Sequence, residues 1–187
     1  MMKRGFDVFL ALFVGVALLL PLLGLLALVR LTSKGPALYW SDRVGKNNIL
    51  FKMPKIRTMR VGTPAVATHL LSNPDAVLTP MGSFLRRSSL DEIPQLWSIL
   101  KGDMSFVGPR PALFNQGDLI ALRSDVGVDR LVPGLTGWAQ VNGRDSLSMP
   151  HKVALDQHYL QNRSFGLDLY ILWLTFLRVI YTNDVSH

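Results

Sequence analysis

The longest apolar pattern in the chain lies near its start. Residues 8–29 form a run of about 22 uncharged positions, and at about 1.5 Å per residue a helix of this length crosses the hydrocarbon core of a bilayer. Basic residues lie on both sides of the run, Lys3 before it and Arg30 and Lys34 after it. Because positively charged flanks stay in the cytoplasm, a helix that enters the membrane and returns fits this pattern better than one that spans it.

Pro21 lies inside the apolar run and supplies a physical means of turning the helix back. Proline removes one backbone hydrogen bond and its ring clashes with the preceding turn, so it kinks or breaks a helix. A single kinked span is the alternative, because membrane helices tolerate proline, whereas no cleavage pattern of a signal peptide follows the run. The charged flanks favour a re-entrant membrane helix over residues 1–32, followed by a small cytosolic domain over residues 33–187.

Beyond the membrane element the pattern changes to short strands and helices. Residues 37–40 and 49–51 alternate weakly around the turn sequence Gly-Lys-Asn-Asn and predict a β-hairpin. Helices are predicted over residues 113–123 and 151–161, and the proline-containing stretch 61–80 predicts a loop or a short helix. The predicted fold class is therefore α+β and mostly helical.

The last strongly apolar stretch, near residues 167–181, predicts a helix too short to span a bilayer. Its aromatic residues, Tyr170 and Trp173 among them, suit a membrane interface, where the ring is buried and its polar edge stays hydrated. One interpretation is an amphipathic helix that lies at the interface. The other is a buried core helix of the soluble domain.

A shorter amphipathic pattern begins at the adjacent acids Asp91 and Glu92. Apolar residues follow at helical spacing, at positions 93, 96, 97 and 100, and Gly102 is typical of a helix end. Pro94 fits a helix only in its first turn, so the helix is predicted to begin at Asp91, with this residue as its N-cap. A helix N-terminus attracts both carboxylates and phosphates, and simple capping is the alternative explanation of the acidic pair.

Arginines surround the acidic pair in the sequence. Arg86 and Arg87 precede it, and Arg110 follows it between two prolines whose fixed φ angles stiffen the backbone. Arginine forks match phosphate oxygens, and adjacent carboxylates among arginines supply a nucleophile or metal ligand together with charge clamps. These are the groups that phosphoryl transfer requires. A solvated salt-bridge cluster is the alternative.

The formal net charge of +7 implies an anionic partner. Nucleic acid is disfavoured, because the arginines cluster around prolines and acids instead of interleaving with aromatic residues. A non-catalytic basic membrane tether that binds anionic lipids or a partner protein explains the charge and the apolar run, but not the acidic pair among arginines. The chain has no cysteine, so a metal would have oxygen or histidine ligands.

Four blocks of sequence carry a family likeness: KIRTM at residues 55–59, LRRSSLDEIPQL at 85–96, KGDMSFVGPRP at 101–111 and VPGLTGWAQVNGR at 132–144. In this order they resemble the bacterial sugar transferase family, the small monotopic phosphoglycosyl transferases, over nearly the whole chain. The resemblance implies a re-entrant membrane helix broken at Pro21. It also implies interfacial amphipathic helices and a catalytic domain on the cytoplasmic face of the bacterial inner membrane.

The same resemblance implies the reaction. In this family an Asp-Glu pair with Mg²⁺ moves a phospho-sugar from a UDP-sugar to polyprenyl phosphate, and the match makes Asp91 the nucleophile and Glu92 its partner, both as metal ligands. The carboxylate attacks the β-phosphorus, UMP leaves, and polyprenyl phosphate collects the phospho-sugar from the aspartyl intermediate. This is the first membrane step of glycoconjugate biosynthesis. An N-acetylated sugar is expected, and the pathway, the oligomeric state and the division of labour within the pair are left open.

Roles for basic residues also follow from the resemblance. Arg86 and Arg110 are implied as phosphate clamps, Lys55 and Arg57 as lining the site, and Arg144 as binding the nucleotide or a phosphate. Magnesium keeps several waters and needs only one or two carboxylates plus diphosphate oxygens, which agrees with the lack of a dedicated His/Asp cage in the sequence. The expected partners are a UDP-sugar, polyprenyl phosphate and membrane lipids.

Overall fold

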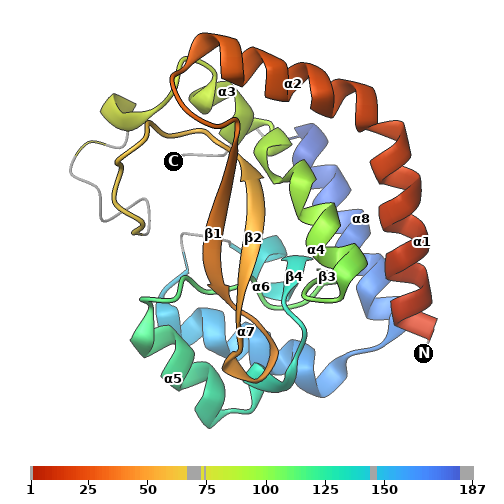
Figure 1. Ribbon diagram of the computed structural model, residues 1–187. Coiled ribbons are helices and arrows are strands. Elements are labelled where there is room, and N and C mark those ends of the chain that lie inside the picture. Colours follow the sequence, from red (N-terminus) through yellow and green to blue (C-terminus); the bar gives the residue numbers. More distant parts are fainter. Residues whose placement is uncertain (1, 67–72, 74, 144–146, 182–187) are drawn as a thin grey trace.

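A computed structural model describes residues 2–66, 73, 75–143 and 147–181 of the protein (Figure 1). Within these residues, helices predominate beside two small two-stranded sheets, which confirms the predicted mostly helical α+β class. A long hairpin runs through the middle of the molecule (Figure 1). The helices α1 (Met2–Ala17), α4 (Leu96–Lys101) and α8 (Phe165–Tyr181) lie on one side of it, and α5 (Gly117–Asp125) and α7 (Met149–Asn162) lie near its turn. The hairpin and the short 3₁₀ helix that precedes α4 contribute residues of the candidate site.

The apolar run forms two helices, α1 (Met2–Ala17) and α2 (Leu19–Thr32), which meet at a bend of 62°. The break is at Leu18, so Pro21 lies in the first turn of α2. Proline has no N–H to donate to the carbonyl of Ala17, one turn earlier, which explains why the helix breaks there. No single helix in the described residues is long and apolar enough to cross a membrane, whereas this bent pair meets that requirement jointly.

The predicted hairpin is confirmed, with longer strands than the sequence pattern indicated. Strands β1 (Leu38–Val44) and β2 (Leu50–Ile56) pair in antiparallel register, with Tyr39 opposite Lys55. The turn η1 (Lys46–Asn48) contains two asparagines with positive φ, a conformation that asparagine tolerates better than most residues. The register places Lys55 on the side of the hairpin that packs on the segment carrying the acidic pair.

The acidic pair lies in a different local structure from the one predicted. After α3 (Gly82–Arg87), the chain forms the 3₁₀ helix η4 (Leu90–Gln95), which continues as α4 (Leu96–Lys101). The prediction that Asp91 caps an α-helix is wrong, because the first turn is a 3₁₀ turn that begins after Ser89, whose φ is 56°. The Glu92 N–H bonds to the Ser89 carbonyl at 3.1 Å, so both acids lie inside the turn.

The tighter winding of η4 also changes which side chains face the core. A 3₁₀ helix turns 120° per residue instead of 100°, so the predicted apolar face is rotated in the following helix. Ile99 is fully buried, whereas Trp97, which was predicted on the buried face, is 57% exposed. Gly102 ends α4 with a φ of 97°, as predicted.

A second, parallel sheet pairs β3 (Ser105–Val107) with β4 (Gly134–Thr136). Gly108, directly after β3, is so close to the backbone of the other strand that an added Cβ would lie 2.4 Å from the Val132 carbonyl oxygen. Only glycine permits this approach. The sheet therefore fixes the start of the loop that carries Arg110.

The remaining helices are η3 (Asp75–Val77), α5 (Gly117–Asp125), η5 (Val128–Arg130), α6 (Trp138–Val141), α7 (Met149–Asn162) and α8 (Phe165–Tyr181). Those predicted over 113–123, 151–161 and 167–181 are confirmed, although α5 begins four residues late. The reason is a turn in which the Leu113 N–H bonds to the side-chain oxygen of Gln116 at 2.8 Å.

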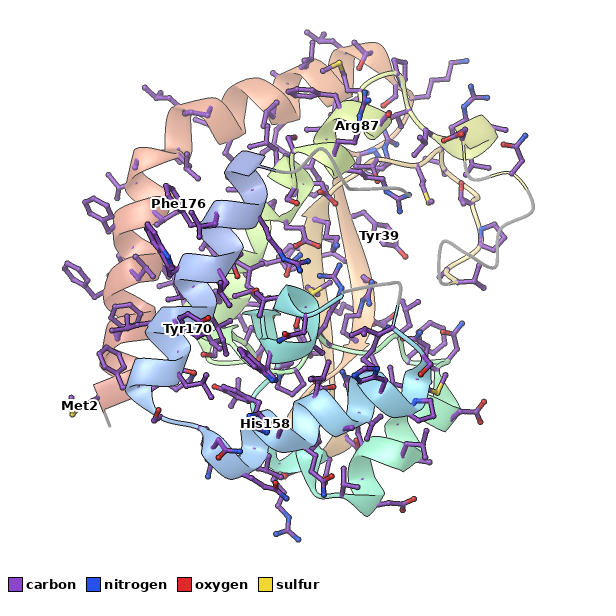
Figure 2. The ribbon with its side chains drawn as sticks, turned by 180° about the vertical axis from the view of Figure 1, so that it is seen from behind. Met2, Tyr39, Arg87, His158, Tyr170 and Phe176 are labelled. Atoms are coloured by element: carbon purple, nitrogen blue, oxygen red, sulfur yellow. The ribbon has the colours of Figure 1, made fainter. Side chains whose placement is uncertain are left out.

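Helix α8 is neither fully buried nor fully exposed. Ile171 is completely buried in the main core, together with Ala11 of α1 and Ile99 of α4. On its other face Trp173 and Phe176 are both more than half exposed. Figure 2 shows Tyr170 and Phe176 projecting from α8 on the side of the molecule that α1 also lines. The helix thus contributes to the core and leaves an aromatic face uncovered.

Candidate active site

Glu92 is the centre of a compact charged cluster drawn from three elements. Its Oε1 atom accepts hydrogen bonds from Lys55 Nζ on β2 at 2.8 Å and from Arg110 Nη2, in the loop after β3, at 2.9 Å. Asp91 is adjacent on η4, and its Oδ2 lies 3.9 Å from the same lysine nitrogen. Both carboxylates and the lysine are largely buried. The fold thus brings five of the predicted groups into one place, counting Arg86 as described below.

The pKa values of the two carboxylates are shifted in opposite directions. Burial acts to raise the pKa of Glu92, but Lys55 and Arg110 outweigh it and hold that pKa well below its usual range. For Asp91, burial is the dominant effect and raises its pKa, with the neighbouring charge of Glu92 adding to the increase. Glu92 is therefore a fixed anion, whereas Asp91 is the more basic and less tightly held carboxylate of the pair.

Arg86 lies on the last turn of α3 and is near enough to Asp91 for its charge to counteract the rise in that pKa. Burial lowers the pKa of Lys55, and the charge of Glu92 only partly offsets this decrease. Arginine and lysine charges therefore surround both acids. An incoming diphosphate would meet cations contributed by α3, β2 and the loop after β3.

One other predicted site residue, Arg57, is not brought to this cluster. The buried guanidinium of Arg57 donates to the Lys34 carbonyl at 2.6 Å and to Ser33 Oγ at 2.7 Å, so it holds the turn after α2. Arg144 lies outside the described residues. Lys55 and Arg57 belong to the same sequence block, but only Lys55 contacts the acids.

Arg43 is a member of the cluster that the sequence analysis missed. Its Nε donates to Ser41 Oγ at 2.9 Å and its Nη1 to the Pro111 carbonyl at 3.1 Å. Burial, followed by repulsion from Arg110, lowers the pKa of Arg43 to about 10. Strand alternation would have found it, because residues 39, 41 and 43 share the face of the hairpin on which Lys55 lies.

A narrow depression next to Arg110 is lined by Arg43, Met53, Gln95, Arg110 and Pro111. The backbone of Arg110 is itself supported, because Arg123 Nη1 donates to its carbonyl at 2.8 Å. Arg123 is anchored by the buried carboxylate of Asp156, with a contact of 2.6 Å. These contacts fix the backbone of Arg110, whose guanidinium donates to Glu92.

The residues of the cluster suit Mg²⁺ that is bound by one or two carboxylates together with substrate phosphates, but not Mg²⁺ that is held by protein side chains alone. No group of three or more His, Asp or Glu side chains within the described residues could hold a metal ion. Mg²⁺, however, binds readily through one or two carboxylates plus substrate phosphates. Asp91, whose carboxylate is beyond hydrogen-bond distance of Lys55, offers such an oxygen ligand beside Glu92.

Comparison with known proteins gives a consistent result over the whole chain. A family model described as bacterial sugar transferase matches residues 1–182. The chain is 39% identical over 188 residues to a protein named uncharacterized sugar transferase EpsL from Bacillus subtilis, with 99% of this chain and 90% of that protein covered.

Two longer relatives have names that specify a reaction. The undecaprenyl-phosphate glucose phosphotransferase of Komagataeibacter xylinus is 39% identical over 97% of this chain, which spans 36% of that protein. The UDP-glucose:undecaprenyl-phosphate glucose-1-phosphate transferase of Escherichia coli is 37% identical over 94% of this chain, which spans 39% of it. With the family model matching nearly every residue, the chain belongs to the bacterial sugar transferase family.

Proposed function

We propose that this chain transfers a phospho-sugar from a UDP-sugar to undecaprenyl or a similar polyprenyl phosphate, and releases UMP. Its family membership and the names of the two longer relatives support this reaction class. The observation that carries the proposal is the position of Asp91 beside Glu92, which Lys55 and Arg110 hold in place. A basic tether would have no use for a buried carboxylate beside such a charge clamp.

The proposed chemistry uses Asp91 as the nucleophile. One of its carboxylate oxygens bonds to the β-phosphorus of the donor, while the bond from that phosphorus to the bridging oxygen breaks and UMP leaves with the electron pair. An oxygen of polyprenyl phosphate then attacks the same phosphorus, and the aspartyl oxygen is released. The raised pKa of Asp91 makes it a better nucleophile than an ordinary aspartate once it is ionised.

The cations stabilise the charge that develops during both displacements. Arg110 and Lys55 bond to Glu92, Arg43 lies close enough to interact with its charge, and guanidinium forks suit phosphoryl oxygens. Asp91 and Glu92 are the residues that would hold Mg²⁺, which when bound would neutralise diphosphate charge. Because Glu92 is already paired with two cations, Asp91 remains the carboxylate available to the donor.

A re-entrant position of α1 and α2 is part of the proposal. Both ends of the bent pair bind the same globular body: Lys3 donates to the Val107 carbonyl at 3.0 Å, and Arg57 donates to the Lys34 carbonyl. A spanning arrangement would separate these ends by a bilayer. Between them Phe9, Phe13 and Val16 are each at least 65% exposed, which suits contact with lipid. This arrangement would put residues 33–187 on the cytoplasmic face of the inner membrane.

The decisive experiment measures UMP release by the membrane-reconstituted protein with single UDP-sugars, undecaprenyl phosphate and Mg²⁺. UDP-glucose belongs in the set because two relatives are named for glucose, and N-acetylated donors test our expectation from the sequence. Asp91→Asn is expected to lower turnover about a thousandfold or more. Asp42→Asn, which removes an exposed carboxylate from the same hairpin, is the matched control. Wild-type turnover by Asp91→Asn would refute the assignment.

A further inference from the structure

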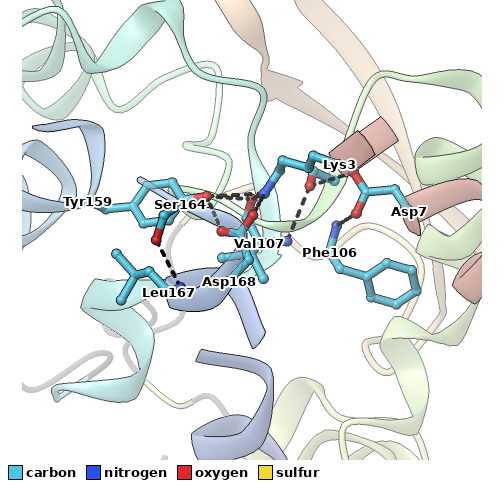
Figure 3. Close-up of polar contacts among 9 residues, drawn as sticks. Lys3, Asp7, Phe106, Val107, Tyr159, Ser164, Leu167 and Asp168 are labelled. Carbon is cyan, nitrogen blue, oxygen red and sulfur yellow. Dashed lines mark hydrogen bonds and ion pairs between the residues drawn. The ribbon is translucent and has the colours of Figure 1, made fainter. Parts of the chain in front are cut away.

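Two side chains near the start of α1, Asp7 and Lys3, bind the interior of the protein. Asp7 accepts a hydrogen bond from the Phe106 backbone N–H at 3.2 Å through Oδ1 and one from Ser105 Oγ at 2.8 Å through Oδ2. Lys3 Nζ donates to the Val107 carbonyl at 3.0 Å (Figure 3). All three of these backbone or side-chain partners belong to strand β3. The first two turns of a helix assigned to the membrane therefore contact one short strand.

These contacts take the place of a missing neighbouring strand. On one edge β3 pairs with β4, with the Ser105 N–H bonded to the Pro133 carbonyl and the Gly108 N–H to the Thr136 carbonyl, each at 2.9 Å. Within the described residues this sheet has two strands, so its other edge has no strand partner. Buried backbone groups must be paired, and here a carboxylate and an ammonium group pair them.

Lys3 is held in turn by two residues from the far end of the sequence. Its ammonium group donates to Asp168 Oδ2 at 2.6 Å and to the hydroxyl of Tyr159 at 3.1 Å, and the Tyr159 hydroxyl donates to Asp168 Oδ1 at 2.6 Å (Figure 3). Burial and the bond to Asp168 raise the pKa of Tyr159, so it stays a donor. Together with the bond to Val107, all three ammonium protons have acceptors.

The same helix start also contacts the segment that carries the acids. Arg4 donates to the Leu100 carbonyl at 2.7 Å and to the Ile99 carbonyl, at the C-terminal end of α4. The last carbonyls of an α-helix lack their regular intrahelical donors, although the Gly102 N–H also bonds to the Ile99 carbonyl at 3.1 Å. A cation at this end complements the helix dipole. Since α4 continues η4, the start of α1 is bonded both to the element of the acidic pair and to the strand that leads to Arg110.

We propose that Asp7 and Lys3 are positioning residues, which set Arg110 against Glu92 by completing the open edge of β3. Only Gly108 and Pro109 separate that strand from Arg110, and the Pro109 carbonyl accepts the Gly134 N–H at 2.9 Å. Because this connection is short and hydrogen-bonded, a shift of β3 would also move Arg110. The inference rests on the proposed function for its catalytic consequence. It means that the position of α1 and α2 against the rest of the protein and the position of Arg110 relative to Glu92 depend on each other.

A double-mutant cycle tests whether Asp7 acts through Arg110. Asp7→Ala leaves the Phe106 N–H without its acceptor and is expected to lower kcat/KM about tenfold, whereas Asp7→Asn keeps an acceptor oxygen and restores most of the activity. In an Arg110→Ala background the same Asp7→Ala change is expected to cost less than about twofold. Asp103→Asn, which breaks an exposed pair with Lys101, is the control. A further full tenfold loss in the Arg110→Ala background would overturn the proposal.

Hydrogen exchange tests the structural link without relying on activity. Asp7→Ala is expected to speed amide exchange across residues 105–110, and Asp7→Asn to leave it close to wild type. Lys3→Met, which removes the donor to Val107, gives the same readout if Asp7→Ala does not fold. Wild-type amide exchange across residues 105–110 in the folded Asp7→Ala or Lys3→Met variant would overturn the proposal. Failure of the proposed function would instead appear as wild-type turnover by Asp91→Asn, with the exchange result still interpretable.

Discussion

Arg110 donates a 2.9 Å hydrogen bond to Glu92, although the two residues are 18 positions apart and lie on different elements. The contact joins the loop after β3 to the 3₁₀ turn of the acids. Lys55 reaches the same carboxylate oxygen from β2. Three separate pieces of the chain must therefore be in place before the clamp exists, and changes in any of them have predictable consequences.

The raised pKa of Asp91 predicts that removing its charge stabilises the fold. Because burial disfavours the ionised form in the folded state, folding stability falls as pH rises through the range between the unfolded and folded pKa values. Asp91→Asn is therefore expected to be more stable than wild type at pH 7, by roughly 2–4 °C in Tm per kcal/mol gained. Below about pH 3.9 the difference should vanish. Thermal unfolding against pH measures it, and a lower Tm for Asp91→Asn at pH 7 would contradict the electrostatic argument.

The lowered pKa of Glu92 predicts the opposite pH dependence. Its stabilising contribution is present above its ordinary pKa of about 4.3 and is lost as pH falls toward the depressed folded value. Lys55→Met removes one cation, so acid unfolding should begin at a higher pH. Lys52→Met, which affects only an exposed ion pair with Asp42, is the matched control and should leave the acid midpoint unchanged. Equal midpoints for both variants would count against the pairing.

The close approach of Gly108 to the neighbouring strand predicts a strong response to a single methyl group. Gly108→Ala would place Cβ 2.4 Å from the Val132 carbonyl oxygen, so β3 must shift and take the following loop with it. We expect stability to fall by about 1–3 kcal/mol and activity to fall further, because Arg110 follows two residues later. Gly117→Ala, where nothing lies within 4 Å of the added carbon, should behave like wild type in chemical unfolding and turnover. Similar behaviour of the two variants would show that the contact is not restrictive.

The bent helix pair predicts that both of its ends are cytoplasmic. Because the chain has no cysteine, Met2→Cys and Lys34→Cys each introduce a unique thiol. In intact cells neither thiol should react with a membrane-impermeant maleimide, and both should react once the inner membrane is permeabilised. A cysteine introduced into a known periplasmic protein confirms that the reagent reaches that compartment. Labelling of the Met2→Cys protein in intact cells would rule out the re-entrant arrangement.

Much of the local structure followed from the sequence because its causes are local. The hairpin depends on turn residues at positions 45–48, and the end of α4 depends on Gly102. The start of that helix was mispredicted, because Pro94 is compatible with both an α-turn and the 3₁₀ turn that forms. Periodicity alone does not distinguish the two.

The site was predictable only in part. Asp91, Glu92, Lys55 and Arg110 meet as the motifs implied, but Arg43 became apparent only from the strand register, and Arg57 turned out to hold the turn after α2. The bonds of Lys3 and Asp7 had no sequence signal at all. Their partners are about a hundred or more residues away, and nothing in a short window records such a pairing.

The bond between Lys3 and Asp168 also constrains the order of events during biosynthesis, since 165 residues separate its two members. At typical translation rates of about 5–20 residues per second, roughly 10–30 s pass between the synthesis of one and of the other. The apolar segment leaves the ribosome before Asp168 is made, so in the proposed re-entrant arrangement it would meet the bilayer before this bond can form. In the proposed arrangement, insertion would therefore precede the folding of the remaining domain, and α8 would join the two through the bond between Asp168 and Lys3.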